Sequence, residues 1–178
     1  VDLSNGNYHL IEKKVVIEGQ KTAYFSEKFL EITVPVTTKE QIKEIKKTVT
    51  HIAKKHDEEP YKALATTQQA IFHQLEEQDE IDAAAIFDKV FEEKPLAREA
   101  AQLAITEERV PEKIAVTNVP KYERKYSKQK FKLDNGIEIT IPSEIYENKE
   151  MVEFINNPDG SVSVLIKNIE SILNKFNA

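Results

Sequence analysis

The segment from Lys121 to Lys132 combines basic and aromatic residues in a pattern that suits binding to nucleic acid. Its twelve residues include six basic side chains and three aromatic ones. The basic residues are Lys121, Arg124, Lys125, Lys128, Lys130 and Lys132. In an extended chain the last three would share one face, because side chains alternate between the two faces of a strand. Such a strip can follow a phosphate backbone while its tyrosines pack on sugars or bases.

A second interpretation of this segment stays open. Lysines are also typical of a charged linker that enters an edge strand, where they prevent pairing between sheets. A predicted helix over residues 39–56 also has two interpretations, because its lysines form either a solvated helix surface or a second contact with DNA. These lysines are Lys43, Lys46, Lys47, Lys54 and Lys55.

No group of residues in the sequence matches a known catalytic site. A phosphate loop, a dinucleotide fingerprint, a nucleophile elbow and a paired-histidine zinc helix are all missing. The best metal candidate is the run from His56 to Glu59, but acidic residues just before a helix ordinarily serve as capping and dipole partners. The acidic run at residues 76–80 is interpreted in the same way, as a solvated turn. We therefore expect no catalytic residues, metal ligands, cofactor or small-molecule substrate, and no enzymatic activity.

The charge of the chain is segregated along its length. The 25 basic and 31 acidic residues give a net charge of −6. By segment, the net charge is +3 for residues 1–56, −10 for 57–112, +6 for 113–133 and −5 for 134–178. Duplex binding depends on neutralisation of phosphates by Lys and Arg. Any DNA contact therefore has to be local, with the acidic helices turned elsewhere or toward another protein.

Composition excludes several other classes of protein. The chain has 178 residues, which suits one domain or two small ones at roughly 100–200 residues per domain. It contains no cysteine, and so no disulfide framework or zinc–thiolate site. Its apolar runs are far shorter than the ~20 residues that span a bilayer, so no membrane partner is expected. Since Met151 is the only methionine and the sequence starts at Val1, we expect a piece of a longer or processed chain.

Residues 1–111 are predicted to form a mainly helical region with a short N-terminal strand. Residues 7–18 are predicted to be extended, with β-branched residues at 15–17. An aromatic-faced helix follows from Lys21 and stops at Pro35. Further helices are predicted from the three-four spacing of apolar residues, with Asp82 as an N-cap and prolines in two first turns. They cover residues 39–56, 60–77, 83–92 and the segment that begins at Pro95. Four or five such helices with short connections favour a compact bundle.

Residues 112–178 are predicted to form an antiparallel β-hairpin module with a C-terminal helix. Residues 112–126 contain two prolines and little periodicity, which indicates a loop or linker. Alternating apolar residues then predict four strands, with a type I′ turn at Asn135-Gly136 and a helix that Asn168 caps. The strands cover residues 128–133, 137–141, 151–156 and 162–166, and a short helix covers 143–149. The predicted fold class is α+β, a helical bundle region followed by a four-stranded antiparallel sheet with a C-terminal helix.

Five segments, in the same order and at similar separations, carry a resemblance to a known family. They are Tyr24–Leu30, Phe131–Ile137, Val152–Phe154, Asp159–Gly160 and Ile166–Ile169. These segments are patterns of core and turn residues, and through them the chain resembles the bacterial nucleoid-associated proteins of the YejK (NdpA) type. The resemblance implies a cytoplasmic, nucleoid-located protein that binds DNA without catalysis. It places the chain in the C-terminal half of such a protein and supplies no catalytic residues.

Two functions follow as hypotheses. The first is a DNA-binding architectural protein that contacts duplex DNA regardless of sequence, through the segment Lys121–Lys132 and the lysines of residues 39–56. The alternative is a protein-interaction or dimerisation module, a homo-oligomer whose DNA contacts lie in the missing half. Its basis is the apolar density of residues 24–32 and 86–91 together with the acidic segment 57–112. A continuous positive surface that joins the two lysine segments would favour the first.

Overall fold

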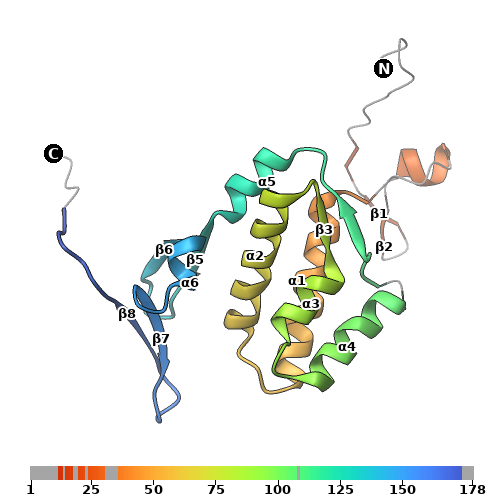
Figure 1. Cartoon of the computed structure of the whole chain (residues 1–178). Coiled ribbons are helices and arrows are strands. Elements are labelled where there is room, and N and C mark those ends of the chain that lie inside the picture. The colour runs from red at the N-terminus through yellow and green to blue at the C-terminus, as the bar shows by residue number, and fades with distance from the viewer. Residues whose placement is uncertain are drawn as a thin grey trace. The chain divides into compact units, whose positions relative to one another are not determined.

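The computed structural model describes residues 12, 13, 15–17, 20–22, 24–30, 36–107 and 109–173. They belong to two compact units, Val1–Thr37 and Thr38–Ala178, which are described separately. Helices and strands are mixed, so the predicted α+β class is confirmed (Figure 1). The expected boundary between residues 111 and 112 falls inside the second unit and stays a prediction.

In the first unit a hairpin precedes a single short helix. Strand β1 (Val15–Ile17) pairs antiparallel with β2 (Gln20–Thr22), and the π-helix η1 spans Tyr24–Phe29. The predicted aromatic helix is therefore present, but it starts after a second strand, and residues 31–35 of the predicted segment lie outside the described residues. Its wide turn is closed by a hydrogen bond from the Leu30 amide to the Phe25 carbonyl, 2.9 Å long.

A carboxylate from outside the helix holds the start of η1. Glu12 accepts hydrogen bonds from the Phe25 and Ser26 amides and from the Ser26 hydroxyl, the last at 2.7 Å. The hydroxyl bond of Ser26, together with the two amide bonds, lowers the pKa of the Glu12 carboxyl. The first amides of a helix have no intrahelical partner, so this carboxylate replaces an N-cap residue.

The second unit contains six α-helices and six strands among the described residues. The helices are α1 (Thr38–Lys55), α2 (Pro60–Glu77), α3 (Ala83–Val90), α4 (Pro95–Thr106), α5 (Val119–Tyr126) and α6 (Ser143–Glu147). The strands are β3 (Glu80–Asp82), β4 (Lys113–Ala115), β5 (Lys128–Lys132), β6 (Glu138–Pro142), β7 (Val152–Asn156) and β8 (Val162–Ile166). The predicted starts of α2, α3 and α4 are confirmed, and Asp82 caps α3 by accepting the Ala85 amide at 2.9 Å.

The core of this unit lies between α1, α2, α3 and α4, where the apolar faces of the four helices meet. Ile45 and Val49 of α1 and Ile71 of α2 are fully buried, as their helical spacing predicts. The segment 86–91 also belongs to this core, because Ile86, Phe87 and Phe91 are at most 1% exposed.

The prediction of a loop over residues 112–126 is wrong. Strand β4 pairs antiparallel with β3 and buries Ile114, and α5 follows it. Asn118 caps α5 by accepting the Lys121 amide at 3.2 Å, and Pro120 sits in the first turn, where its missing amide costs nothing. A strand of three residues shows no periodicity, and the prolines that suggested a linker mark a helix start instead.

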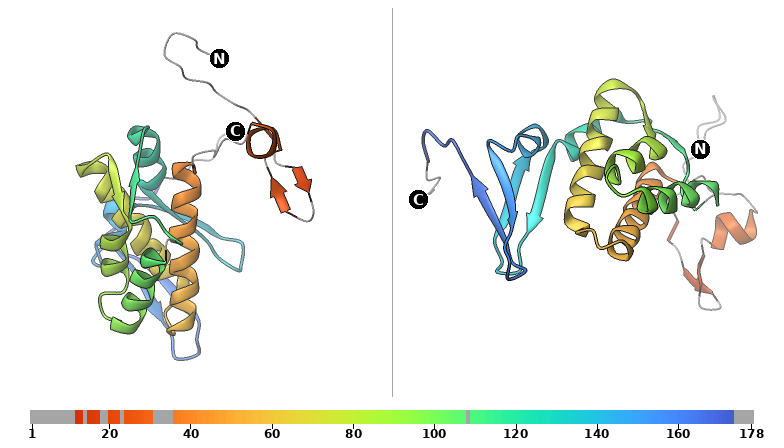
Figure 2. Two further views of the ribbon diagram at one scale, coloured as in Figure 1. Left: turned by 90° about the vertical axis from the view of Figure 1, so that its right-hand side faces the viewer. Right: turned by 60° about the horizontal axis from the view of Figure 1, so that its bottom comes forward.

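The last four strands form two separate hairpins, β5–β6 and β7–β8, rather than the predicted four-stranded sheet. Figure 2 shows the two hairpins side by side. Aromatic rings fill the space between the hairpins. The ring centroids of Phe131 on β5 and Phe154 on β7 are 5.1 Å apart, and each lies 5.6 Å from the ring centroid of Tyr146 on α6. Side-chain packing therefore takes the place of a backbone ladder.

The hairpin β5–β6 closes through a turn that differs from the predicted type I′. The Gly136 amide donates to the Leu133 carbonyl, and only Gly136 in this turn has a positive φ, 88°. The two central residues of the turn, Asp134 and Asn135, have negative φ, and the glycine that follows them adopts the left-handed conformation.

Substitution of Gly136 tests this turn. We expect Gly136→Ala to lower hydrogen-exchange protection of the Leu133 amide by roughly 5- to 30-fold, because a Cβ in the left-handed region costs about 1–2 kcal/mol. Gly136→Asn should lose less, since asparagine tolerates that conformation. Equal protection in Gly136→Ala and the unaltered chain would contradict the turn geometry.

The predicted C-terminal helix is absent over residues 168–173, which have no regular secondary structure. Asn168 has a left-handed φ of 55°, and its side chain donates to the Glu150 carbonyl at 3.2 Å. It therefore ends the β8 strand instead of capping a helix. Residues 174–178 of the predicted helix lie outside the described residues.

Candidate nucleic-acid interface

A groove of about 1140 Å³ lies between the helices α1 and α2 and the two hairpins. Lysines line it from two sides, four on α1 and two on β5. These six groove lysines are Lys43, Lys46, Lys47, Lys54, Lys130 and Lys132. Lys46 is half-buried and the other five are exposed. The two lysine-rich segments that the sequence singles out thus meet at one feature of the surface.

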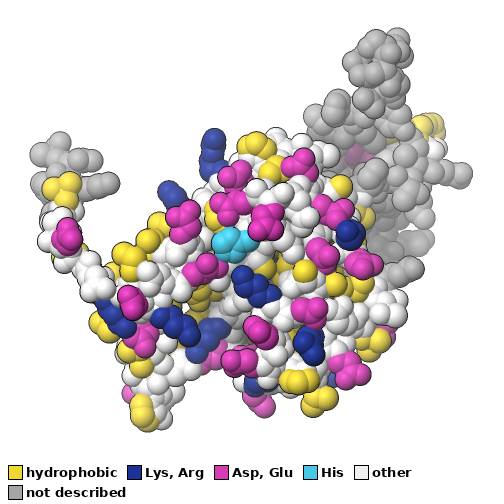
Figure 3. Space-filling model, viewed as in Figure 1, with side chains coloured by type: hydrophobic (Ala, Val, Ile, Leu, Met, Phe, Trp, Pro, Cys, Tyr) yellow, Lys and Arg dark blue, Asp and Glu magenta, His cyan; other side chains and the backbone are white. Residues whose placement is uncertain are grey.

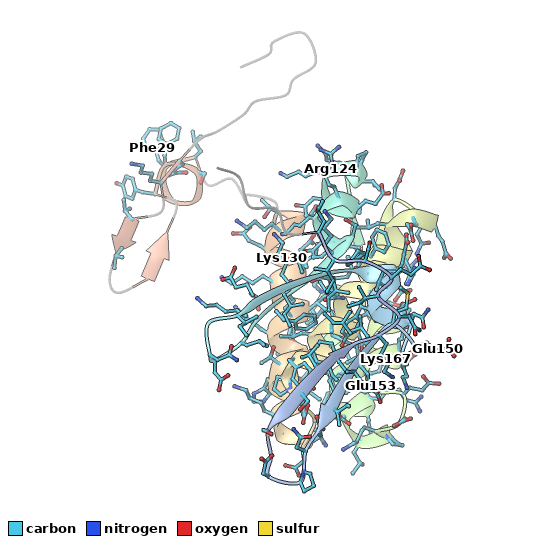
Figure 4. All side chains as sticks on the ribbon, turned by 90° about the vertical axis from the view of Figure 1, so that its left-hand side faces the viewer. Phe29, Arg124, Lys130, Glu150, Glu153 and Lys167 are labelled. Atoms are coloured by element: carbon cyan, nitrogen blue, oxygen red, sulfur yellow. The ribbon has the colours of Figure 1, made fainter. Side chains whose placement is uncertain are left out.

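The structure divides the eleven candidate DNA-binding residues into two sets. The six groove lysines form the first, and Lys55, Lys121, Arg124, Lys125 and Lys128 lie outside the groove lining. Figure 4 shows Lys130 on β5 and Arg124 on α5. The predicted extended strip therefore holds only over β5, where Lys128, Lys130 and Lys132 are exposed and alternate with Gln129 and Phe131.

Few carboxylates accompany these cations. Over the described ranges, the only candidate within ion-pair distance of an acid is Lys47, whose Nζ lies 2.7 Å from Glu44. Asp134 is the single acidic residue among the described groove-lining residues. The positive charge of the groove is thus largely uncompensated by the described part of the chain.

Two of these cations share one tyrosine ring where α1 meets α5. The Nζ atoms of Lys46 and Lys125 lie 5.4 and 5.1 Å from the ring centroid of Tyr126. Tyr122 stacks on Tyr126 with an interplanar angle of 16°. Burial, and then the charge of Lys125, lower the pKa of Lys46. A nearby anion would counteract this lowering of the pKa, because an opposite charge favours the protonated form of lysine.

The buried tyrosine of this cluster gives the protein a sensitivity to alkaline pH. Burial, and then the neighbouring Tyr122, raise the pKa of the Tyr126 phenol to about 12, above its ordinary value of 10.0. A raised pKa in the folded state means that this phenol adds stability below pH ~10 that is lost as the pH rises through about 12.

We therefore expect the thermal stability of the chain to fall between pH 10 and 12 more steeply than that of Tyr126→Phe. The phenylalanine variant keeps the ring and removes the titrating group. Melting curves of both proteins at a neutral and at an alkaline pH measure the difference. Parallel losses for the two proteins would contradict a special role of Tyr126.

Two glutamine side chains join helix α2 and strand β5 by hydrogen bonds to each other's backbone beside the groove. Gln129 is buried and donates to the Ala65 carbonyl at 3.0 Å. Gln68 donates to the Tyr126 and Lys128 carbonyls at 3.2 and 2.8 Å. These amides hold β5 against α2, so the lysines of β5 keep a set position relative to α1.

Apolar and aromatic side chains complete the floor. They are Tyr61 and Leu64 of α2, Phe131 of β5, Phe154 of β7, and Val162 and Val164 of β8. Sequence reasoning misses their role, and it also misses His51, which lines the groove from α1. With His51 included, these residues come from five separate elements, and no local pattern in the sequence connects them.

The acidic part of the sequence forms a different surface. Figure 3 shows acidic side chains spread over the face formed by α2, α3 and α4, with Lys and Arg between them. No described residues gather into a group of three histidine or carboxylate side chains that could hold a metal ion. None of the described helices is long and apolar enough to cross a membrane.

Comparison with known proteins identifies the family. The family model described as nucleoid-associated protein YejK matches residues 2–174, nearly the whole chain. No significant match was found among curated proteins or among solved structures. The placing of this chain in the C-terminal half of such a protein stays a prediction. With residues 2–174 matched, the chain belongs to the family of the nucleoid-associated protein YejK.

Proposed function

We propose that this chain binds duplex DNA without reading its base sequence, as an architectural, non-catalytic component of the bacterial nucleoid in the cytoplasm. The observation that carries the proposal is the meeting of the two lysine segments at one groove, with Lys43 and Lys54 on one side and Lys130 on the other. Membership of a nucleoid-associated family supports it.

Electrostatics support a local mode of contact. Exposed lysines with few acidic neighbours can neutralise phosphates and release counterions, which gives affinity without base contacts. The segment 57–112 carries a net charge of −10, but none of its described acidic side chains lines the groove, to which it contributes only uncharged residues of α2. The proposed contacts are the eleven basic residues named above, with the groove lysines at their centre.

The salt dependence of duplex affinity tests this proposal. We expect log K to fall linearly with log salt, with a slope of roughly −0.9 for each phosphate that a basic residue neutralises. The triple variant Lys125→Gln, Lys128→Gln, Lys130→Gln should bind more weakly and with a shallower slope. Undetectable binding of the unaltered chain at low salt, or an unchanged slope in the triple variant, would rule the proposal out.

The second candidate function is a protein-interaction or dimerisation module. The apolar segment 86–91 no longer supports this function, because its large apolar side chains lie in the core and are not available to a partner. The basis at η1 remains, since Phe25 and Phe29 stack at 5.4 Å and Phe29 is 69% exposed (Figure 4). Sedimentation velocity over a range of concentrations tests it. A monomer at high concentration would count against a homo-oligomer, and Phe29→Ser should weaken any dimer.

A further inference from the structure

We infer that the groove binds an unpaired DNA strand, with its lysines on the phosphates and its apolar floor against the faces of the bases. This inference deepens the proposed function, because it assigns part of the same lysine surface to a particular form of DNA. It is carried by the combination of charged walls and an aromatic floor in one groove.

The floor has no use in duplex binding alone. A duplex presents phosphates and sugars to a non-specific partner, while the faces of its bases are stacked inside. Phe131, Phe154 and Tyr61 line the groove and are half-buried, so each ring keeps part of its surface toward the groove. An unpaired strand exposes base faces that can pack on such rings, and grooves that bind single strands combine this packing with positive charge.

The size and shape of the groove suit a chain-like ligand. Its volume of about 1140 Å³ exceeds the ~1,000 Å³ upper range of sites for drug-sized molecules. The lysines are spread along α1, from Lys43 to Lys54, which spans three turns of helix. A single small anion would use one end of this row, whereas successive phosphates of a strand can use all of it.

The polar groups of the floor predict little base preference. Gln68 and Gln129 already donate to backbone carbonyls of the protein. Recognition by the floor would thus depend on packing against base faces, which every base has. Unpaired strands of different sequence should bind with similar affinity.

The test compares three probes of the same length, about 12 units, by fluorescence anisotropy at ~50 mM salt. The probes are oligothymidine, an abasic phosphodiester of equal charge, and a duplex. We expect oligothymidine to bind at least about tenfold more tightly than the abasic chain, because packing of bases on the floor adds to phosphate contact. Equal affinity for these two probes would overturn the inference.

Matched lysine variants locate the site. Lys54→Gln with Lys130→Gln removes two groove charges, and Lys121→Gln with Lys128→Gln removes two charges outside the groove. We expect the first pair to weaken oligothymidine binding at least about fivefold more than the second pair. Equal losses would overturn the assignment to the groove.

The duplex probe separates this inference from the proposed function. Duplex binding without a preference for oligothymidine over the abasic chain would leave the proposed function standing and remove the inference. Tight binding of oligothymidine without duplex binding would keep the inference and remove the proposed function.

Discussion

Charge reversal of Lys54 and Lys130 to glutamate is expected to weaken duplex binding by more than about 100-fold at ~0.1 M salt. Each phosphate contact with its released counterion contributes roughly eightfold at that salt concentration, so the loss of two contacts gives about 60-fold. Two carboxylates next to the remaining phosphates add repulsion. The two residues lie on opposite sides of the groove, so the variant changes the surface that joins the two lysine segments.

A control with the same change in net charge separates local contact from overall charge. Lys89 on α3 and Lys149 after α6 are exposed and do not line the groove. Their double reversal to glutamate should weaken binding by less than about tenfold, because surface charges farther than a Debye length of ~10 Å are screened. Equal losses in the two double variants would show that only net charge matters and would remove the groove as the contact site.

Phe87→Ala is expected to lower the free energy of unfolding by about 3–5 kcal/mol. Phe87 on α3 is 0% exposed and lies in the core between the helices. Truncation removes the burial of an aromatic ring and leaves a cavity that the neighbouring helices only partly fill. For a chain of this size the melting temperature should fall by roughly 10 °C, and urea denaturation measures the free energy.

The comparison variant for Phe87 is Leu96→Ala on α4. Leu96 is 71% exposed, so its truncation should change stability by less than about 0.5 kcal/mol. Phe87→Leu should recover much of the loss, since leucine fills most of the ring volume. A loss below ~1 kcal/mol for Phe87→Ala would mean that the packing of α3 in the core is not as described.

Helices with a long apolar stripe were predictable from the sequence. The period of Ile42, Ile45 and Val49 defines α1 because one face of a long helix must be buried. The start of α3 was predictable for a local reason, because Asp82 caps the helix by accepting a hydrogen bond from the amide of Ala85, only three residues further on.

Features that depend on distant residues were not predictable. Glu12 holds η1 through residues 13 and 14 positions further along the chain, and β4 exists because β3 pairs with it. The four-stranded sheet was a reasonable inference from alternating residues, because alternation identifies strands but not which strands pair. The rings of Phe131, Tyr146 and Phe154 decide against a ladder between the hairpins, and no local pattern reveals that.

The candidate site was predictable in its charges but not in its shape. Both lysine segments are visible in the sequence, whereas the groove exists because Gln68 and Gln129 fix β5 to α2. The division of the lysines into groove-lining and outer sets is likewise a tertiary property. So is the shared ring of Tyr126, which brings Lys46 and Lys125 together across 79 residues.

The separation of the two hairpins has a mechanical consequence for the groove. A hydrogen-bonded ladder fixes the spacing of neighbouring strands near 4.8 Å and allows sliding only in whole residues. Ring contacts such as Phe131–Phe154 permit gradual tilts and shifts, because aromatic pairs keep favourable contact over centroid distances of about 4.5–7 Å. The hairpin β7–β8, which contributes part of the apolar floor, can thus shift relative to β5–β6 and change the width of the groove without breaking a backbone hydrogen bond to β5 or β6.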